Sequence, residues 1–176
     1  MIQSKTELDL FHTTEDPWGY ENNNEDLIRK EILLNEIPKQ PYKNVLDIGC
    51  GQGFITQYLP GETIWGVDLS QNAIEFAKKN CTGNKFNFIQ GSIFEIDKLV
   101  DLKFDLVVIT GVLYPQYIGN SSSLIYLLVD KILATNGTLI SVHINEWYTC
   151  QFPYLRSKQT FYNYREYIHH LETYIK

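Results

Sequence analysis

The segment from Val45 to Phe54 constrains the fold more than any other part of the chain. Val45 to Ile48 form an apolar run that carries one acid, and Gly49, Gly51 and Gly53 follow at alternate positions. This pattern predicts a buried strand, a tight turn and then a helix. Glycines let the backbone approach a ligand where a Cβ would block it. Because open α/β sheets bind ligands at the carboxyl ends of their strands, the segment also predicts a ligand site at this turn.

Strand-like and helix-like patterns alternate along the chain. We expect a helix over 25–37, then strands over 44–48, 63–68, 86–90, 106–109 and 138–144, with helices over 54–59, 70–79 and 122–133 and a turn at 136–137. This alternation predicts an α/β fold with a doubly wound, mostly parallel sheet. The chain is expected to be a single domain, with an N-terminal arm and helix over 1–42 and an α/β core over 43–176.

Composition narrows the classes of function. The 176 residues suit one domain with a substantial core, and a net charge of -6 argues against a general binder of nucleic acid. The first residues lack the apolar core of a signal peptide, and no apolar run is long enough to cross a bilayer. We therefore expect a cytoplasmic protein with no membrane or nucleic-acid partner. Cys50, Cys81 and Cys150 lack metal-ligand spacing, so free thiols and no metal site are expected.

The glycine spacing separates two kinds of nucleotide site. Dinucleotide-binding proteins use G-x-G-x-x-G, whereas this chain has G-x-G-x-G with Asp47 before the first glycine. The segment resembles motif I of class I S-adenosylmethionine (SAM) dependent methyltransferases. The resemblance implies SAM as cofactor and S-adenosylhomocysteine (SAH) as product. It places Asp47 near the methionine amino group, and Gly49, Cys50, Gly51 and Gly53 beneath the methionine and ribose.

Two later strand ends complete the expected cofactor site. Asp68 ends a strand about twenty residues after the glycine turn, where an acid can accept both ribose hydroxyls. Its alternative role is an acid favoured by a helix N-terminus. The run 65–70 is similar to the family's second motif, which implies that Leu69 packs against adenine. The family often has an acid at Ser92, so either the Ser92 hydroxyl or the Ile93 backbone is the expected adenine contact, and an ordinary turn is the alternative.

The ends of the fourth and fifth predicted strands are expected to face the reacting methyl group. Thr110 is a predicted cofactor contact, and Gly111 stands where relatives often carry an acid. Tyr114 is predicted to contact the substrate and to hydrogen bond the nucleophile, although tyrosine is a poor base because its free pKa is about 10. His143 is the predicted base and a second substrate contact, with a structural histidine as the alternative. Glu146 is a further candidate.

An aromatic segment precedes the first strand. Asp16-Pro17-Trp18-Gly19-Tyr20 is predicted to form a lid, with Trp18 covering the sulfonium through cation–π attraction and Tyr20 contacting the substrate. A simple hydrophobic anchor is the alternative. This segment, followed by a helix with Glu25 and Arg29 and then by motif I, resembles the NodS-like group of small methyltransferases. Members of that group act on sugars or other small molecules.

The resemblance also implies how the sheet ends. A class I methyltransferase finishes with an antiparallel strand pair, so the aromatic tail over 152–176 is expected to supply it and complete a seven-stranded Rossmann-like sheet. A helix is the alternative, because Tyr164, Tyr167, Ile168, Leu171 and Tyr174 also fit a helical period.

Together these features predict a SAM-dependent methyltransferase that moves a methyl group in line to a small polar acceptor such as a sugar or nucleotide sugar. The missing acids at Ser92 and Gly111 leave a SAM-binding regulator or inactive partner subunit open. A protein or nucleic-acid acceptor is the other alternative, although neither a basic cluster nor an Asn-Pro-Pro-Tyr motif is present. Tyrosines in the tail are compatible with a monomer or a homodimer.

Overall fold

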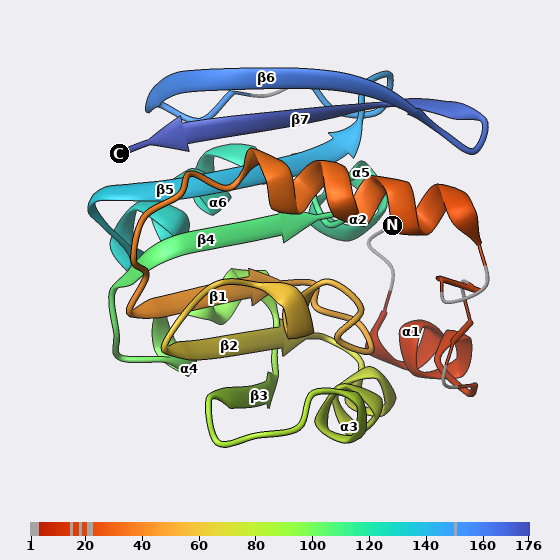
Figure 1. The fold of residues 1–176 in the computed structure, drawn as a ribbon. Helices are drawn as coiled ribbons and strands as arrows, with labels where there is room; N and C mark the ends of the chain where they lie inside the picture. Colours follow the sequence, from red (N-terminus) through yellow and green to blue (C-terminus); the bar gives the residue numbers. More distant parts are fainter. Residues whose placement is uncertain (1–3, 15, 18, 21–22, 150) are drawn as a thin grey trace.

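A single seven-stranded sheet runs through the computed structural model, which describes residues 4–14, 16–17, 19–20, 23–149 and 151–176 (Figure 1). The strand order is β3-β2-β1-β4-β5-β7-β6. The strands are β1 (Asn44–Ile48), β2 (Thr63–Asp68), β3 (Phe86–Gln90), β4 (Phe104–Thr110), β5 (Leu133–Ile144), β6 (Leu155–Tyr164) and β7 (Tyr167–Ile175). All neighbours pair in parallel except β7, which is antiparallel to both β5 and β6. The predicted α/β sheet and its antiparallel tail are therefore confirmed.

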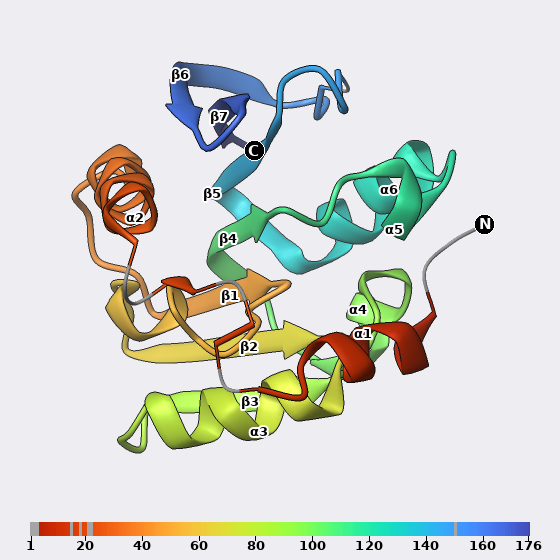
Figure 2. The same cartoon turned by 90° about the vertical axis from the view of Figure 1, so that its right-hand side faces the viewer.

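Helices cover both faces of this sheet. They are α1 (Lys5–Phe11), α2 (Asn24–Glu36), α3 (Gln71–Asn80), α4 (Ile96–Leu99), α5 (Pro115–Ile118) and α6 (Ser122–Ile132), with short 3-10 turns η2 (Thr56–Tyr58) and η3 (Ile93–Glu95). Figure 2 shows α2 on one side of the sheet and α4, α5 and α6 on the other. Each side buries its own apolar cluster, one containing Leu33 of α2 and the other containing Ile125 and Val129 of α6. Within the described part of the chain, no helix combines the length and apolarity needed to cross a bilayer.

The strand ends bring the predicted ligand-binding segments together. β1, β2 and β4 run parallel, so their carboxyl ends share one edge of the sheet. Figure 1 shows α1 beyond the ends of β1 and β2 at this edge. The loops that follow these strands therefore meet in front of the sheet, where the N-terminal arm can cover them.

One predicted helix is wrong. Residues 54–59 form only the 3-10 turn η2, because six residues between Gly53 and Pro60 leave no room for a stable helix before proline ends it. Phe54, Ile55 and Leu59 still bury their side chains in the cluster beneath α2. The predicted turn at 136–137 also differs, since β5 passes through it with Asn136 at φ 62°, a backbone conformation that asparagine tolerates.

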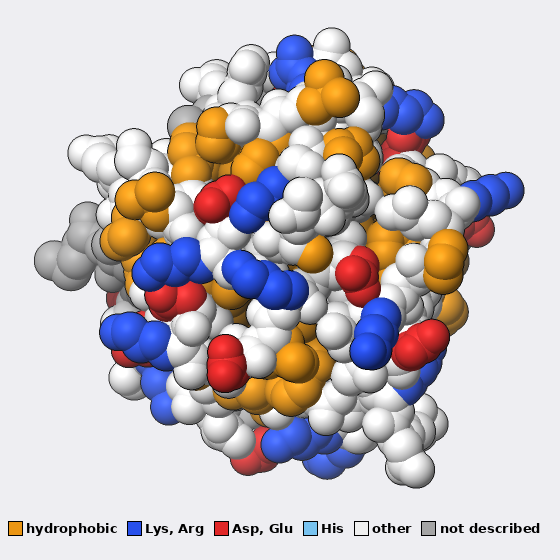
Figure 3. Space-filling view, turned by 90° about the vertical axis from the view of Figure 1, so that its left-hand side faces the viewer, with side chains coloured by type: hydrophobic (Ala, Val, Ile, Leu, Met, Phe, Trp, Pro, Cys, Tyr) orange, Lys and Arg blue, Asp and Glu red, His pale blue; other side chains and the backbone are white. Residues whose placement is uncertain are grey.

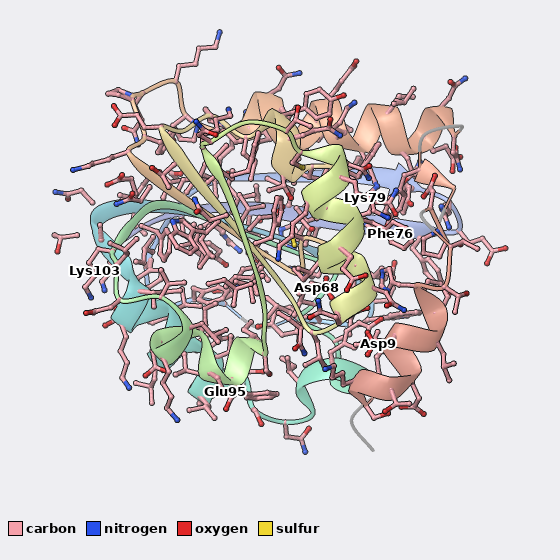
Figure 4. The ribbon with its side chains drawn as sticks, turned by 90° about the horizontal axis from the view of Figure 1, so that it is seen from below. Asp9, Asp68, Phe76, Lys79, Glu95 and Lys103 are labelled. Carbon is pink, nitrogen blue, oxygen red and sulfur yellow. The ribbon has the colours of Figure 1, made fainter. Side chains whose placement is uncertain are left out.

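The N-terminal arm contains a helix that the sequence interpretation missed. Ser4 and Glu7 form a capping box in which the Ser4 hydroxyl accepts from the Glu7 N–H and the Glu7 carboxylate accepts from the Ser4 N–H. The helix then docks through Asp9, whose carboxylate accepts from the Ser70 hydroxyl at 2.8 Å and from the Gln71 N–H at 2.9 Å. Figure 4 shows Asp9 and Asp68 beside the first turn of α3. The arm is thus fixed at the ligand-binding edge.

Candidate active site

A pocket of about 460 Å³ opens at the carboxyl ends of β1, β2 and β4. This volume lies within the range of pockets that bind small molecules and cofactors. Residues of the N-terminal arm, the glycine turn, the strand ends and the tail hairpin all line it. Of the predicted site residues, these line the pocket: Tyr20, Asp47, Gly49, Cys50, Gly51, Asp68, Leu69, Ser92, Ile93, Thr110 and Tyr114. Trp18, the predicted cover of the sulfonium, lies outside the described residues.

The three glycines of the turn have different roles. All three have positive φ, at 79° for Gly49, 52° for Gly51 and 87° for Gly53. A Cβ on Gly49 would lie 2.2 Å from Cγ2 of Val112, whereas a Cβ on Gly51 would meet nothing within 4 Å and would occupy open space beside the pocket. Gly53 does not line the pocket, and a Cβ at this position would lie only 2.5 Å from the Cys81 sulfur. Gly49 and Gly51 thus line the pocket and are called the glycine cradle below, whereas Gly53 lets the turn pack against α3.

Asp68 joins the glycine turn to the start of α3. One carboxylate oxygen accepts from the Gly51 N–H at 2.9 Å and the other accepts from the Ser70 N–H at 2.9 Å. Burial raises the pKa of Asp68, and these backbone donors oppose the rise. The acid is held at the end of β2 with its carboxylate at the pocket wall, which suits a carboxylate that accepts hydrogen bonds from ribose hydroxyls.

Asp47 is a buried acid with one unused oxygen. Its Oδ2 accepts from the Thr56 hydroxyl at 2.6 Å, while its Oδ1 is buried and has no hydrogen-bond partner among the described residues. Burial raises the pKa of Asp47 to about 7. An unpartnered acceptor is costly in a buried site, and a ligand ammonium group would satisfy it. The glycine cradle, this acceptor and Asp68 together fit the amino acid and ribose parts of SAM.

The expected adenine side of the pocket is largely apolar. Leu69, Ile93 and Phe94 line it together with Ser92. The Ser92 hydroxyl accepts from the Phe94 N–H at 3.2 Å and caps η3, so its role includes fixing this turn. Both predicted adenine contacts therefore lie in the pocket, where their contact with adenine stays a prediction.

The other end of the pocket is an aromatic chamber that includes residues the sequence interpretation did not single out. The chamber is lined by Tyr20, Arg29, Tyr114, Trp147, Tyr164, Arg165, Tyr167 and His169. The Arg29 guanidinium lies 4.7 Å from the ring centre of Tyr20 and 5.1 Å from that of Tyr164, which are cation–π distances. Two cationic side chains and several rings thus face the same space.

One buried carboxylate organises this chamber. Asp26 is fully buried and accepts from the Arg29 Nε at 2.7 Å, from the Tyr164 hydroxyl at 2.6 Å and from Arg165 at 3.2 Å. Two further acids lie close by, since the Glu25 carboxylate accepts from the Arg165 N–H at 3.2 Å and the Asp16 carboxylate accepts from the Tyr20 N–H at 2.9 Å. The Nε of Arg29 donates to Asp26, and the hydrogen bonds among the described residues do not involve the two terminal nitrogens of that guanidinium. The chamber can therefore receive a negatively charged or strongly polar group.

The structure does not bring His143 to the pocket. Side chains alternate along β5, so Val142 and Ile144 line the pocket while His143 points to the opposite face and packs against Tyr148. Burial lowers the pKa of His143 to about 4. The predicted place of His143 as base and substrate contact is therefore wrong, and Glu146, which is exposed, does not line the pocket either.

Tyr114 and His169 both line the pocket and carry groups that can form a hydrogen bond with an acceptor hydroxyl. The Tyr114 hydroxyl accepts from the Ile144 N–H at 3.0 Å, and burial raises its pKa to about 12. His169 lines the chamber from β7. Burial lowers its pKa to about 4, so it is neutral near pH 7, and its Nδ1 has no partner among the described residues. His169 can therefore accept a hydrogen bond from a ligand, whereas Tyr114 is a weak base.

Comparison with known proteins identifies the family. A family model described as a methyltransferase domain matches residues 39–174. The chain belongs to this methyltransferase family. The predicted enzyme class is therefore confirmed.

A relative and two solved structures extend this comparison. An uncharacterized Haemophilus influenzae protein is 32% identical over 133 residues, which are 71% of this chain and 51% of that protein. The chain thus spans about half the length of this relative. The N-methyltransferase NodS from Bradyrhizobium japonicum with bound SAH has a TM-score of 0.84 at 18% identity, covering 98% of this methyltransferase and 97% of NodS. Magnesium protoporphyrin IX methyltransferase from Synechocystis with bound SAM has a TM-score of 0.73 at 16% identity, covering 100% and 98% of the two chains. Both likenesses confirm the fold.

Replacing Asp68 should weaken cofactor binding. We expect Asp68→Ala to raise the dissociation constant for SAH by about 10- to 100-fold, because hydrogen bonds to a charged group contribute about 1.5–3 kcal/mol. Isothermal titration calorimetry would measure it, with circular dichroism as the check on folding. Asp101→Ala, which removes an exposed acid far from the pocket, is the matched control. Equal affinity in both variants would contradict the role given to Asp68.

Asp47 should make cofactor binding and stability respond to pH in opposite directions. Its folded pKa of about 7 lies above the reference value of 3.8, so the folded state holds the proton more tightly than the unfolded state. The free energy of unfolding of the ligand-free protein should therefore fall as pH rises between these values. Only ionised Asp47 pairs well with an ammonium group, so SAH affinity should rise on the order of tenfold from pH 6 to pH 8.

Asp47→Asn provides the comparison for both effects. This variant keeps an acceptor for Thr56 but cannot ionise, so its stability and its SAH affinity should both lose the Asp47 component of the pH dependence. Denaturant unfolding and calorimetry at several pH values would measure them. The same pH profiles in the variant and the wild type would show that Asp47 is not the titrating group.

Proposed function

We propose that this methyltransferase uses SAM to methylate a small polar acceptor, for which a sugar or nucleotide sugar is our first candidate. One observation supports this proposal: a single pocket contains both the glycine cradle, with Asp47 and Asp68 beside it, and the aromatic chamber. The cradle suits the amino acid and ribose of SAM, and the chamber then lies where an acceptor would meet the methyl group. NodS and the porphyrin methyltransferase, both similar in fold, were solved with SAH or SAM bound.

The chamber's chemistry favours a sugar-like or anionic acceptor. Aromatic rings offer flat apolar surfaces to the C–H faces of a sugar, and the Arg29 guanidinium suits phosphate or carboxylate oxygens because its donors form a planar fork. A nucleotide sugar would use both features.

Methyl transfer in this pocket depends mainly on alignment. SAM, when bound, supplies an activated methyl group, and the residues need to hold the acceptor in line with it and exclude water. The neutral His169 imidazole can accept a hydrogen bond from an acceptor hydroxyl, and the Tyr114 hydroxyl is fixed by the Ile144 N–H. Such alignment can supply on the order of 7–11 kcal/mol of the barrier reduction.

The surface opposite the pocket does not favour a polyanionic partner. Figure 3 views the molecule from the amino ends of the parallel strands and shows acidic and basic side chains interspersed, without a basic patch on that face. The net charge of -6 also argues against a polyanionic partner.

The first experiment is thermal unfolding with SAM, SAH and NAD. A ligand at a hundred times its dissociation constant adds about 2.7 kcal/mol of stability, so SAM and SAH should raise the melting temperature and NAD should not. SAM turnover is then measured on sugars, nucleotide sugars, RNA and protein. Turnover on a sugar or nucleotide sugar supports the proposal. Turnover only on RNA or protein, or binding of SAM without turnover on any acceptor, contradicts it and favours the other acceptors or a regulator.

Trp147 should affect the acceptor but not the cofactor. It lies 5.0 Å from Tyr167 and 5.5 Å from Tyr114 between ring centres and forms part of the chamber wall. We expect Trp147→Ala to raise KM for the acceptor several-fold to about tenfold, because an aromatic contact contributes about 0.5–1.5 kcal/mol. SAH affinity should stay within about twofold. Tyr58→Ala, at a similarly exposed aromatic outside the pocket, is the control, and an unchanged KM in Trp147→Ala would remove Trp147 from the acceptor site.

A further inference from the structure

Three metal-ligand side chains gather on the face of the sheet opposite the pocket. His143 on β5 pairs directly with His170 on β7, and Glu172 lies two residues further along β7 on the same face. One ligand atom from each residue can be chosen so that all three lie within 4.8 Å of one another. The methyl-transfer proposal uses none of the three.

These side chains leave hydrogen-bonding capacity unused. His143 is 1% exposed and Glu172 is 2% exposed. The Nδ1 of His143 and the Nε2 of His170 are buried and have no hydrogen-bond partner among the described residues. Buried polar atoms are normally paired, so two unpaired imidazole nitrogens beside a carboxylate need an explanation.

The charge state of the cluster suits a cation. Glu172 supplies a carboxylate beside the two imidazole rings, and imidazole binds metals in its neutral form. Arg156 is the cation that now faces the cluster, and its guanidinium donates to Glu172 at 2.8 Å. The side chain of Arg156 is one-third exposed and can turn toward solvent. The tyrosines packed nearby, Tyr148 and Tyr174, carry no charge near pH 7.

We propose that His143, His170 and Glu172 bind a zinc ion. Two imidazoles and one carboxylate are a recurrent zinc ligand set, and a site with three protein ligands leaves its fourth position to water. Magnesium and calcium are disfavoured because they prefer oxygen ligands. Zinc bonds of about 2.0–2.2 Å hold tetrahedral ligand atoms roughly 3.4 Å apart, so each ligand atom needs to move inward by less than about 1 Å.

The bound ion would cross-link β5 to β7. His169 and Ile144, next to the ligands along these strands, face the other side and line the pocket. Zinc would therefore fix the two strands that carry one wall of the aromatic chamber without touching the reacting groups. This proposal does not depend on the acceptor or on SAM.

The test uses the whole 176-residue chain after a chelator has been added and then removed. Cobalt(II) is titrated first, because four-coordinate cobalt absorbs visible light strongly and reports its ligands directly. We expect saturation at one equivalent, loss of the absorption when zinc displaces cobalt, and a higher melting temperature with zinc. No absorption change and no stabilisation of the wild-type protein would overturn the proposal without recourse to any variant.

Variants then test the ligands. His143→Gln and Glu172→Gln keep similar volume and should each weaken cobalt binding by more than about 100-fold, since even residues that only orient a ligand alter metal affinity by about 10- to 100-fold. His169→Gln changes the neighbouring histidine that faces the pocket and should bind cobalt as the wild type does. Equal binding in all three variants, or equal loss in all three, would overturn the assignment.

A variant of Arg156 distinguishes a metal site at Glu172 from a purely structural ion pair between Arg156 and Glu172. If zinc and Arg156 compete for Glu172, Arg156→Gln should tighten cobalt binding by several-fold, although the metal-free protein loses the ion pair. An unchanged or weaker cobalt affinity in this variant would contradict the competition and with it the position of the ion at Glu172.

Discussion

The Asp68 carboxylate is the interaction on which the rest of the cofactor edge depends. It binds the Gly51 N–H on one side and the Ser70 N–H on the other, so it fixes the glycine turn relative to β2 and to the first turn of α3. Asp9 from the N-terminal helix binds the same turn of α3 and places that helix at the pocket rim. The acid that best suits the ribose therefore also holds the cradle and the adjoining helix in position.

Asp26 has a comparable role at the other end of the pocket. A fully buried carboxylate is unfavourable unless it is paired, and here three donors from α2, β6 and the β6–β7 turn converge on it. The requirement to satisfy Asp26 draws Arg29, Tyr164 and Arg165 together, and all three side chains line the aromatic chamber. Chain segments more than a hundred residues apart thus form one binding surface because of one buried acid.

The sequence predicted the parts of the site that depend on local pattern. Motif I and Asp68 follow strands whose apolar runs are easy to recognise, and parallel strands bring their carboxyl ends together without further information. His143 was misplaced because the end of a strand was recognised but the alternation of its side chains was not applied. The arm helix was missed although Ser4 and Glu7 carry the capping-box spacing. Arg29, Tyr164 and His169 could not be assigned, since their meeting depends on the register of the tail hairpin and on pairing with Asp26.

The same alternation gives the β5–β7 pair two separate surfaces. His169 and His170 are neighbours in sequence, but one lies beside Tyr164 in the aromatic chamber and the other stacks on Phe161 and lies beside His143. A one-residue shift of β7 would turn its side chains to the opposite faces, so His170 and Glu172 would point into the pocket and His169 would point away from it. The long antiparallel pairing of β5, β6 and β7 prevents this shift. An ion bound by His143, His170 and Glu172 would therefore stiffen β5 and β7 without replacing any side chain that lines the aromatic chamber.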